Sequence, residues 1–191
     1  MLLSRLKTLT SVAVLAVASV AAHAADPMKA GFVYIGPTGD HGWTYSHDQG
    51  RKALEAQSGG KVTTTFVESV QETADAERVF RDLAQKGHKV IFGTSFGYMN
   101  QMLKVAKAFP KTTFMHATGY KTAPNLGVYD VRTYEGAYML GVVAGKMSKN
   151  NKVGYVASIP IPEVIRNINA FTDGARTVNQ ANTTKAIWIN S

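Results

Sequence analysis

Short apolar runs alternate with stretches of helical periodicity along most of this chain, and this alternation restricts the folds available to it. The runs are nearly continuous instead of alternating with polar residues, which predicts strands buried on both faces of a parallel sheet. The predicted strands are Ala30–Ile35, Val62–Val67, Lys89–Phe92, Thr113–Ala117, Leu126–Val131 and Val153–Ala157.

Between these runs, apolar residues recur at intervals of three and four, as they do on one face of a helix. The clearest stripes are Met99, Met102, Leu103 and Ala106, and then Val164, Ile168, Phe171 and Ala175. Strands and helices are therefore predicted to alternate throughout. The expected fold class is α/β, with a doubly wound, mostly parallel sheet.

A last apolar run, Lys185–Ile189, lies just before the end of the sequence. A strand this apolar needs neighbours on both sides. We therefore expect an N-terminal α/β lobe over residues 25–157. Residues 158–191 are expected to form a crossover helix and the first strand of a second lobe, with the remainder of that lobe absent.

The first residues have the pattern of an export signal. Arg5 and Lys7 precede the apolar run Leu9–Val20, and a small-x-small site ends at Ala24. The pattern predicts a secretory signal over residues 1–24, cleaved after Ala24, with an uncut anchor as the alternative. The sequence has no cysteine, so a lipid-modified cysteine is excluded and a soluble, exported product is expected.

Charge and motifs argue against several classes of function. The formal net charge is +8, but lysine and arginine are scattered, without a run of four; we expect a solvated basic surface and no nucleic-acid partner. Neither a Walker loop nor a G-x-S-x-G elbow occurs. His41 and His47 lie six residues apart across a predicted turn, a poor arrangement for zinc. No enzyme, cofactor or metal site is expected.

The loop Gly36–Gly50, GPTGDHGWTYSHDQG, follows the first predicted strand. In an open α/β sheet, ligands bind at the carboxyl ends of the strands, and glycines at the start of the loop allow a sharp turn. A carboxylate, an indole and two hydroxyls could contact a ligand, from Asp40, Trp43, Thr44 and Tyr45. The alternative is a strand-to-helix turn whose indole fills the core.

Two later segments also follow predicted strands. The first, Gly93–Tyr98, offers Ser95, Phe96 and Tyr98 as contacts; a helix-entry turn with Phe96 packed inward is the alternative. The second, beginning at Pro160, opens the last long helix with residues that suit a first turn, and this helix carries Glu163 and Arg166. A polar helix face is usually only solvated, so the helix alone indicates little.

Four segments together resemble the BMP family (basic membrane protein, PnrA-like) of substrate-binding proteins for ABC importers. They are GPTGDHGWTYSHDQGR at Gly36–Arg51, FGTSFGYM at Phe92–Met99, YEGAYMLGVVAGKMSK at Tyr134–Lys149 and VGYVASIPIPEVIRNINAFTDGAR at Val153–Arg176. The resemblance implies a type I periplasmic-binding fold, a periplasmic monomer, and a two-lobed clamshell that passes purine nucleosides or bases to a membrane permease.

The resemblance also implies roles for individual residues. Trp43 would stack on the base, while Asp40 and Thr44 would hydrogen-bond the ligand or hold the loop. Ser95 and Phe96 resemble a second contact loop. Glu163 and Arg166 would lie where the chain crosses towards the other lobe, and the helix Tyr134–Lys149 would pack small residues against the sheet.

One departure concerns the ligand. Many relatives carry phenylalanine with serine and asparagine in the first loop, where this chain has Gly42, Trp43 and Thr44. The change is compatible with a free base or another flat heterocycle in place of a nucleoside. A sensory protein of the same fold, presenting its ligand to a receptor, is the alternative function.

Overall fold

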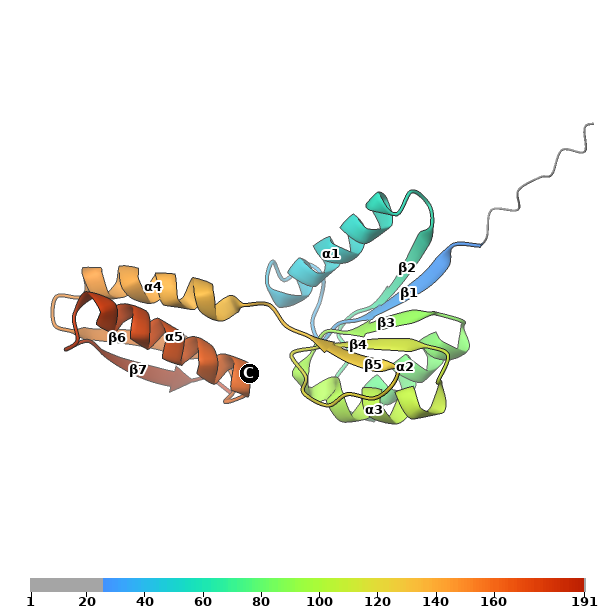
Figure 1. Cartoon of the computed structure of the whole chain (residues 1–191). Helices are drawn as coiled ribbons and strands as arrows, with labels where there is room; N and C mark the ends of the chain where they lie inside the picture. Colours follow the sequence, from blue (N-terminus) through green and yellow to red (C-terminus); the bar gives the residue numbers. More distant parts are fainter. Residues whose placement is uncertain (1–25, 191) are drawn as a thin grey trace, which may run out of the picture.

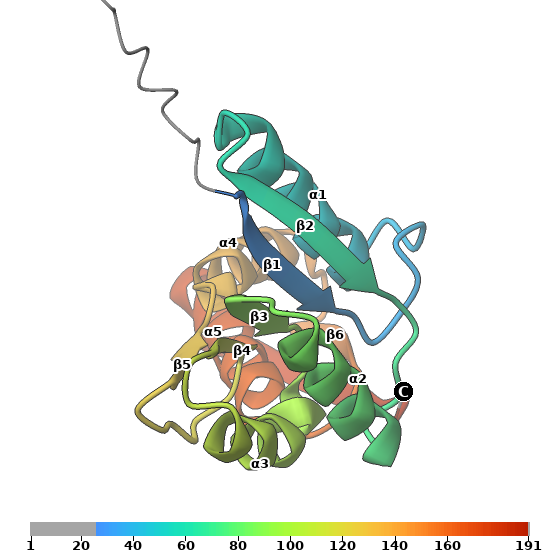
Figure 2. The ribbon, with the colours of Figure 1, turned by 90° about the vertical axis from the view of Figure 1, so that its right-hand side faces the viewer.

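The computed structural model describes residues 26–190, which contain two separate parallel sheets (Figures 1 and 2). The larger sheet has the order β2-β1-β3-β4-β5. This order is doubly wound and confirms the predicted α/β class. Its strands are β1 (Met28–Val33), β2 (Val62–Val67), β3 (Val90–Gly93), β4 (Thr113–Ala117) and β5 (Leu126–Tyr129).

Helices cover both faces of the larger sheet. Side chains alternate along β1, so Val33 points into the core beneath α2 (Ala74–Gln85) and α3 (Met99–Ala108). Tyr34, just after β1, points to the opposite face, where its hydroxyl donates a hydrogen bond to Asp48 of α1 (Trp43–Gln57) over 3.4 Å. Because successive side chains of a strand point to opposite faces, the sheet can pack against helices on both sides.

One connection departs from strict alternation, because no helix lies between β4 and β5. The side-chain amide nitrogen of Asn125 shares its two hydrogens among three carbonyl oxygens, those of Ala106, Phe109 and Thr112, at 3.0, 3.0 and 2.8 Å. These bonds tie the start of β5 to the end of α3. The short connection then places β5 beside β4 without a crossover helix.

The second sheet consists of two parallel strands, β6 (Lys152–Ala157) and β7 (Thr183–Trp188). Two helices, α4 (Thr133–Met147) and α5 (Pro162–Val178), belong to the same part of the chain. The sequence-based boundary at residue 157 grouped β6 with the first lobe; in the structure it pairs with β7 instead. The chain passes from one sheet to the other at residues 130–132, between β5 and α4 (Figure 1). Periodicity identifies a strand but not its partner, so the boundary was misplaced.

The glycines of α4 also have a different role from the predicted one. A Cβ atom added to Gly141 would overlap the carbonyl oxygen of Phe171 in α5, and one added to Gly174 would overlap the carbonyl oxygen of Tyr138 in α4. The small residues therefore allow α4 and α5 to approach backbone to backbone, instead of seating α4 on the sheet.

Among the helices of residues 26–190, none combines the length and apolar character that crossing a membrane requires. The predicted secretory signal over residues 1–24 lies outside the described residues.

Candidate functional site

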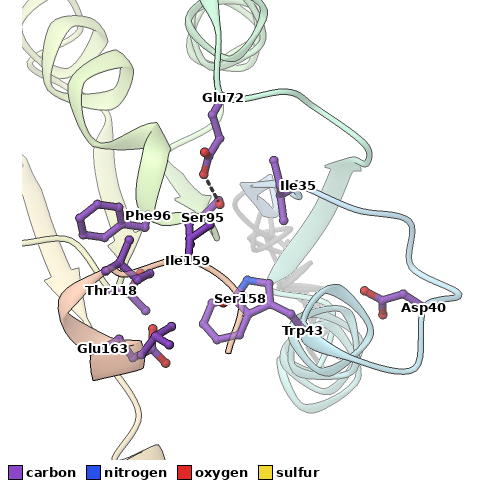
Figure 3. A pocket seen from close by; sticks show the side chains of 12 residues that line it. Ile35, Asp40, Trp43, Glu72, Ser95, Phe96, Thr118, Ser158, Ile159 and Glu163 are labelled. Carbon is purple, nitrogen blue, oxygen red and sulfur yellow. Dashed lines mark hydrogen bonds between the residues drawn. The ribbon is translucent and has the colours of Figure 1, made fainter. Parts of the chain in front are cut away.

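An open cavity of about 560 Å³ lies at the carboxyl ends of the strands of the larger sheet, facing the start of α5 (Figure 3). Its walls come from the segments that follow β1, β2, β3 and β4 and from the turn between β6 and α5. The lining residues are Ile35, Asp40, Trp43, Glu72, Ser95, Phe96, Thr118, Ser158, Ile159, Ile161, Glu163 and Val164.

Trp43 is the first residue of α1, so the helix begins inside the segment predicted as a loop. Its indole Nε1 donates a hydrogen bond to the carbonyl oxygen of Thr94, just after β3. The ring lies 4.6 Å from that of His47, centroid to centroid, and the residue is 38% exposed. The indole therefore lines the cavity from a fixed position instead of filling the core, contrary to the alternative interpretation.

The carboxylate of Asp40 holds the first turn of α1. It accepts hydrogen bonds from the backbone N–H groups of Gly42, Thr44 and Tyr45 at 2.8, 3.3 and 3.0 Å. These N–H groups have no partner within the helix, and a negative charge is favourable at a helix N-terminus. The bonds, that from Gly42 first, lower the pKa of Asp40. Asp40 thus holds the loop, as one of its two predicted roles required.

We expect Asp40→Asn to lower the thermal unfolding midpoint by a few degrees at pH 7. Because the pKa of Asp40 is lowered in the folded protein, its contribution is present above the ordinary aspartate pKa and is lost as the pH falls through the folded value. The difference between variant and wild type should therefore shrink in acid. Calorimetric scans at pH 7 and pH 3 measure it, with Asp26→Asn as the control; a difference that is constant with pH would contradict the assignment.

The remaining predicted residues of the first loop do not line the cavity. Thr44 is fully buried, and its Oγ1 accepts a hydrogen bond from the N–H of Gly36 at 3.2 Å, so it holds the turn and does not reach a ligand. Tyr45 packs against His41 instead, with ring centroids 5.0 Å apart. The left-handed conformation in this loop lies at His41 (φ 53°) and not at a glycine.

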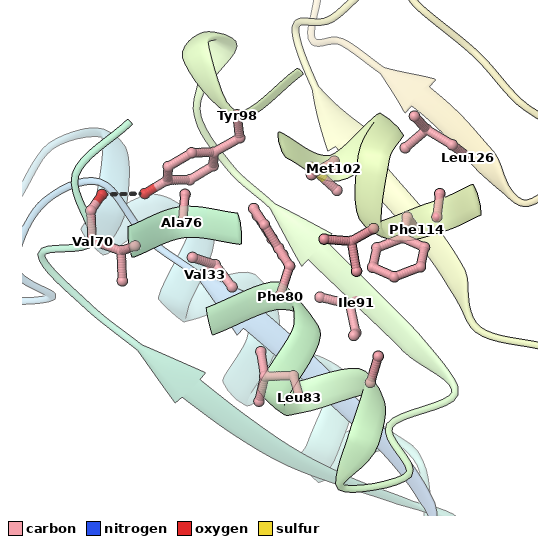
Figure 4. Packing of buried hydrophobic residues seen from close by; sticks show 13 residues of the cluster. Val33, Val70, Ala76, Phe80, Leu83, Ile91, Tyr98, Met102, Phe114 and Leu126 are labelled. Atoms are coloured by element: carbon pink, nitrogen blue, oxygen red, sulfur yellow. Dashed lines mark hydrogen bonds between the residues drawn. The ribbon is translucent and has the colours of Figure 1, made fainter. Parts of the chain in front are cut away.

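In the segment after β3, Ser95 and Phe96 line the cavity, but Tyr98 does not. Tyr98 is fully buried, and its hydroxyl donates to the carbonyl oxygen of Val70 (Figure 4). The short 3₁₀ helix η1 (Phe96–Tyr98) turns the two aromatic rings in different directions. The alternative interpretation chose the wrong ring, since it is Tyr98 and not Phe96 that packs inward.

Glu163 and Arg166 lie on the same helix but face different surroundings. Glu163 lines the cavity, and burial, followed by the nearby charge of Asp130, raises the pKa of its carboxyl group. Arg166 does not line the cavity; its guanidinium pairs with Asp130 at 2.5 Å and lies 5.3 Å from the ring centroid of Tyr134. Arg166 thus ties α5 to the crossing segment and is not placed to contact a ligand in this cavity.

Seven of the lining residues were not among those predicted from the sequence: Ile35, Glu72, Thr118, Ser158, Ile159, Ile161 and Val164. A usable signal existed for two of them. Glu72 and Thr118 follow the carboxyl ends of β2 and β4, where the rule applied to the other loops also places ligand contacts. The residues after β6 come from the second sheet, and no local pattern predicted that this sheet faces the first.

The chemistry of the cavity wall is acidic and apolar. Its carboxylates are Asp40, Glu72 and Glu163, and its hydroxyls are Ser95, Thr118 and Ser158; lysine, arginine and histidine are missing from the lining that residues 26–190 provide. Residues 26–190 hold no cluster of side chains suited to a metal ion. These walls favour a neutral or cationic ligand that donates hydrogen bonds and offers a flat face to an aromatic ring.

Comparison with known proteins identifies the family. The sequence model of the ABC transporter substrate-binding protein PnrA-like family matches residues 28–191. This chain belongs to that family. The predicted resemblance is confirmed.

Individual relatives differ in the ligand that their names state. A purine-binding protein of Brucella abortus is 56% identical over 171 residues, which cover 90% of this chain and 49% of the relative. A putative ABC transporter glucose-binding protein of Haloferax volcanii is 46% identical over 166 residues, covering 87% of this chain and 42% of the relative. This family member thus spans about half the length of the curated relatives it matches.

Solved structures agree with the fold. A solute-binding protein of an ABC transporter from Aeropyrum pernix superposes with a TM-score of 0.72 at 22% identity, covering 85% of this chain and 47% of that one. At this identity the likeness concerns the fold alone, and it supports the predicted periplasmic-binding type.

Proposed function

We propose that this protein is the ligand-binding component of an ABC importer and that it takes a purine nucleoside or purine base into the cavity at the carboxyl ends of β1 to β4. The ligand would then pass to a membrane permease. Binding occurs without catalysis, and the work of the site is recognition.

The position of Trp43 is the observation that carries this proposal. Its indole lines the cavity and is anchored at Nε1 by the carbonyl oxygen of Thr94, while Phe96 lines the same cavity from another loop. An anchored ring loses little freedom when it stacks on a second flat ring, and aromatic stacking contributes ~0.5–1.5 kcal/mol beyond area burial. A purine offers such a ring.

The polar groups of the wall suit the edge of a purine or the hydroxyls of a ribose. The carboxylates of Glu72 and Glu163 accept hydrogen bonds, and the hydroxyls of Ser95, Thr118 and Ser158 both donate and accept. Amino groups, ring N–H groups and sugar hydroxyls are therefore matched by acceptors. A phosphate has no cationic partner among the described lining residues, so an unphosphorylated purine fits better than a nucleotide.

Isothermal titration with adenosine, guanosine, adenine and glucose tests the proposal. We expect saturable binding of at least one of the purines and no heat from glucose at the same concentrations. Adenosine monophosphate serves as the matched control for charge, and we expect it to bind more weakly than adenosine. Binding of glucose without binding of any purine would overturn the proposal.

A hexose is the second candidate ligand, since the relative from Haloferax volcanii carries a glucose-binding name. An indole also packs against the apolar face of a sugar ring, and carboxylates accept bonds from sugar hydroxyls. The purine is favoured because the relative with the higher identity, 56%, is named purine-binding and because both Trp43 and Phe96 line the cavity.

The proposal also includes the location of the protein and the membrane protein to which it delivers its ligand. The signal over residues 1–24 would be cleaved after Ala24, leaving a monomer outside the cytoplasmic membrane, in the periplasm. Loss of labelled purine uptake in a strain lacking this protein would support delivery to a permease. Unchanged uptake combined with loss of a purine response would favour the sensory alternative.

A further inference from the structure

The turn formed by Thr94 and Ser95 lies at the centre of several contacts beneath the cavity. The backbone N–H and the hydroxyl of Thr94 both donate to the carbonyl oxygen of Val33, at 3.1 and 3.2 Å. The carbonyl oxygen of Thr94 accepts the bond from Trp43. The position of Ser95 and Phe96 relative to the indole therefore depends on how this turn is held.

Two ionisable side chains hold the next residue from opposite sides. On the side of the cavity, Oε1 of Glu72 accepts a hydrogen bond from the Ser95 hydroxyl (Figure 3). The same oxygen accepts a second bond, at 2.8 Å, from the N–H of Gly97. On the inner side, Nε2 of His116 lies 2.7 Å from the carbonyl oxygen of Ser95. His116 belongs to β4 and is fully buried.

The surroundings of His116 fix its protonation and tautomer. A carbonyl oxygen only accepts hydrogen bonds, so Nε2 must carry the hydrogen. The other ring nitrogen, Nδ1, is buried and lacks a partner among residues 26–190. A Cβ atom added to Gly119 would overlap this nitrogen, so the backbone after β4 closes over that edge of the ring. A second proton at Nδ1 would find no acceptor there, and the ring is neutral.

We propose that His116 is a positioning residue of this site: its Nε2–H group holds the carbonyl of Ser95 and thereby sets where Ser95 and Phe96 face the ligand. The expected effect on ligand affinity rests on the proposed function. The expected effect on the conformation of the turn is independent of that function, because it follows from the hydrogen bond between His116 and Ser95 alone.

Burial of the ring makes this contact sensitive to acid. Burial lowers the pKa of His116, while the Ser95 carbonyl and the charge of Glu72 act in the opposite direction. The other neighbours described, Gly119 and the paired residues Gly93 of β3 and Val128 of β5, are uncharged. Because the pKa of His116 is lowered in the folded protein, the ring is protonated only below the ordinary histidine pKa of about 6.5. The second proton, on Nδ1, then faces a backbone that offers it no acceptor.

Two substitutions separate the hydrogen bond from the volume of the ring. His116→Gln retains an N–H donor of similar reach, whereas His116→Met has similar size and no donor. The N–H of Tyr98 donates to the same Ser95 carbonyl oxygen at 3.1 Å, and that of Gly97 donates to Glu72. A net hydrogen bond corresponds to roughly a three- to tenfold change in an equilibrium. We expect His116→Met to speed amide hydrogen exchange at Gly97 and Tyr98, and to weaken adenosine binding, by about that factor. His116→Gln should leave both close to wild type.

The pH profile gives a readout that a merely structural role would not move. We expect adenosine affinity of the wild type to fall more steeply than that of His116→Gln as the pH is lowered below about 6.5, because only the wild type can be protonated at this position. Unfolding midpoints of both variants are measured in parallel, so that a loss of folded protein is not counted as a loss of affinity.

Several outcomes would overturn the inference. Equal exchange at Gly97 and Tyr98 in both variants and the wild type would show that the ring does not hold the turn, and faster exchange with unchanged affinity would show that binding does not depend on it. If His116→Met fails to fold, ¹⁵N spectra of the wild-type imidazole decide, since a hydrogen on Nδ1 at pH 7 contradicts the assigned contact. If the wild type binds no purine, the proposed function fails, while the exchange comparison still tests the contact.

Discussion

Replacing Trp43 with alanine is expected to weaken purine binding by roughly ten- to a thousandfold. The variant loses aromatic stacking, which contributes ~0.5–1.5 kcal/mol, and apolar contact, which contributes ~1.5–3 kcal/mol for a large side chain. It also loses the bond from Nε1 to the carbonyl oxygen of Thr94 that connects α1 to the turn after β3. Trp43→Phe keeps a stacking ring without this bond and should lose less.

The chain supplies a matched control for this measurement. Trp188 of β7 is 37% exposed, against 38% for Trp43, and it does not line the cavity. Calorimetric titration of Trp43→Ala, Trp43→Phe and Trp188→Ala with the same purine therefore separates the site from the general effect of losing an indole. Equal affinities for wild type and a folded Trp43→Ala protein would show that the indole does not contact the ligand.

The second large effect concerns the contact between α4 and α5. Gly141→Ala should lower the free energy of unfolding by an amount at the upper end of the ~1–3 kcal/mol typical of overpacking. The added carbon would meet the backbone carbonyl of Phe171, 2.8 Å from its carbon atom, and a helix backbone cannot rotate aside as a side chain can. The two helices would have to separate, exposing the surface between them.

Gly136 of α4 is the control for this substitution, because nothing lies within 4 Å of the Cβ atom that alanine would add there. Glycine inside a helix is less favourable than alanine by roughly 0.5–1 kcal/mol, so Gly136→Ala should stabilise slightly. Urea unfolding followed by circular dichroism compares the two variants. Similar stabilities would mean that α4 and α5 do not pack through their glycines.

The larger sheet could be predicted from the sequence because its strands are local, continuous apolar runs. The limits of β2 and β4 agree with the predicted ones, while β1 and β5 end two residues earlier than predicted, at Val33 and Tyr129. The partner of β6 could not be predicted in this way. Its residues make contacts with β7 that are distant in sequence, and apolar periodicity does not specify a partner.

The candidate site was predictable to the extent that it follows the ends of strands. Asp40, Trp43, Ser95 and Phe96 line the cavity because they follow β1 and β3. Burial of Tyr98 was not predictable, since only the geometry of η1 decides which of two nearby aromatic rings turns inward. The contact between His116 and Ser95 joins two strand ends, and single-strand patterns carry no information about it.

The fluorescence of Trp43 can also report whether the cavity is occupied, because its indole lines the cavity and its N–H group has a fixed partner. The sequence contains two tryptophans, and they belong to elements of different sheets, α1 beside the larger sheet and β7 of the smaller one. Light emitted by an indole depends on the polarity around its ring and on the partner of its N–H group. A molecule that covers Trp43 changes that environment while leaving Trp188 as an internal reference, so occupancy of the cavity can be followed by fluorescence without any added dye.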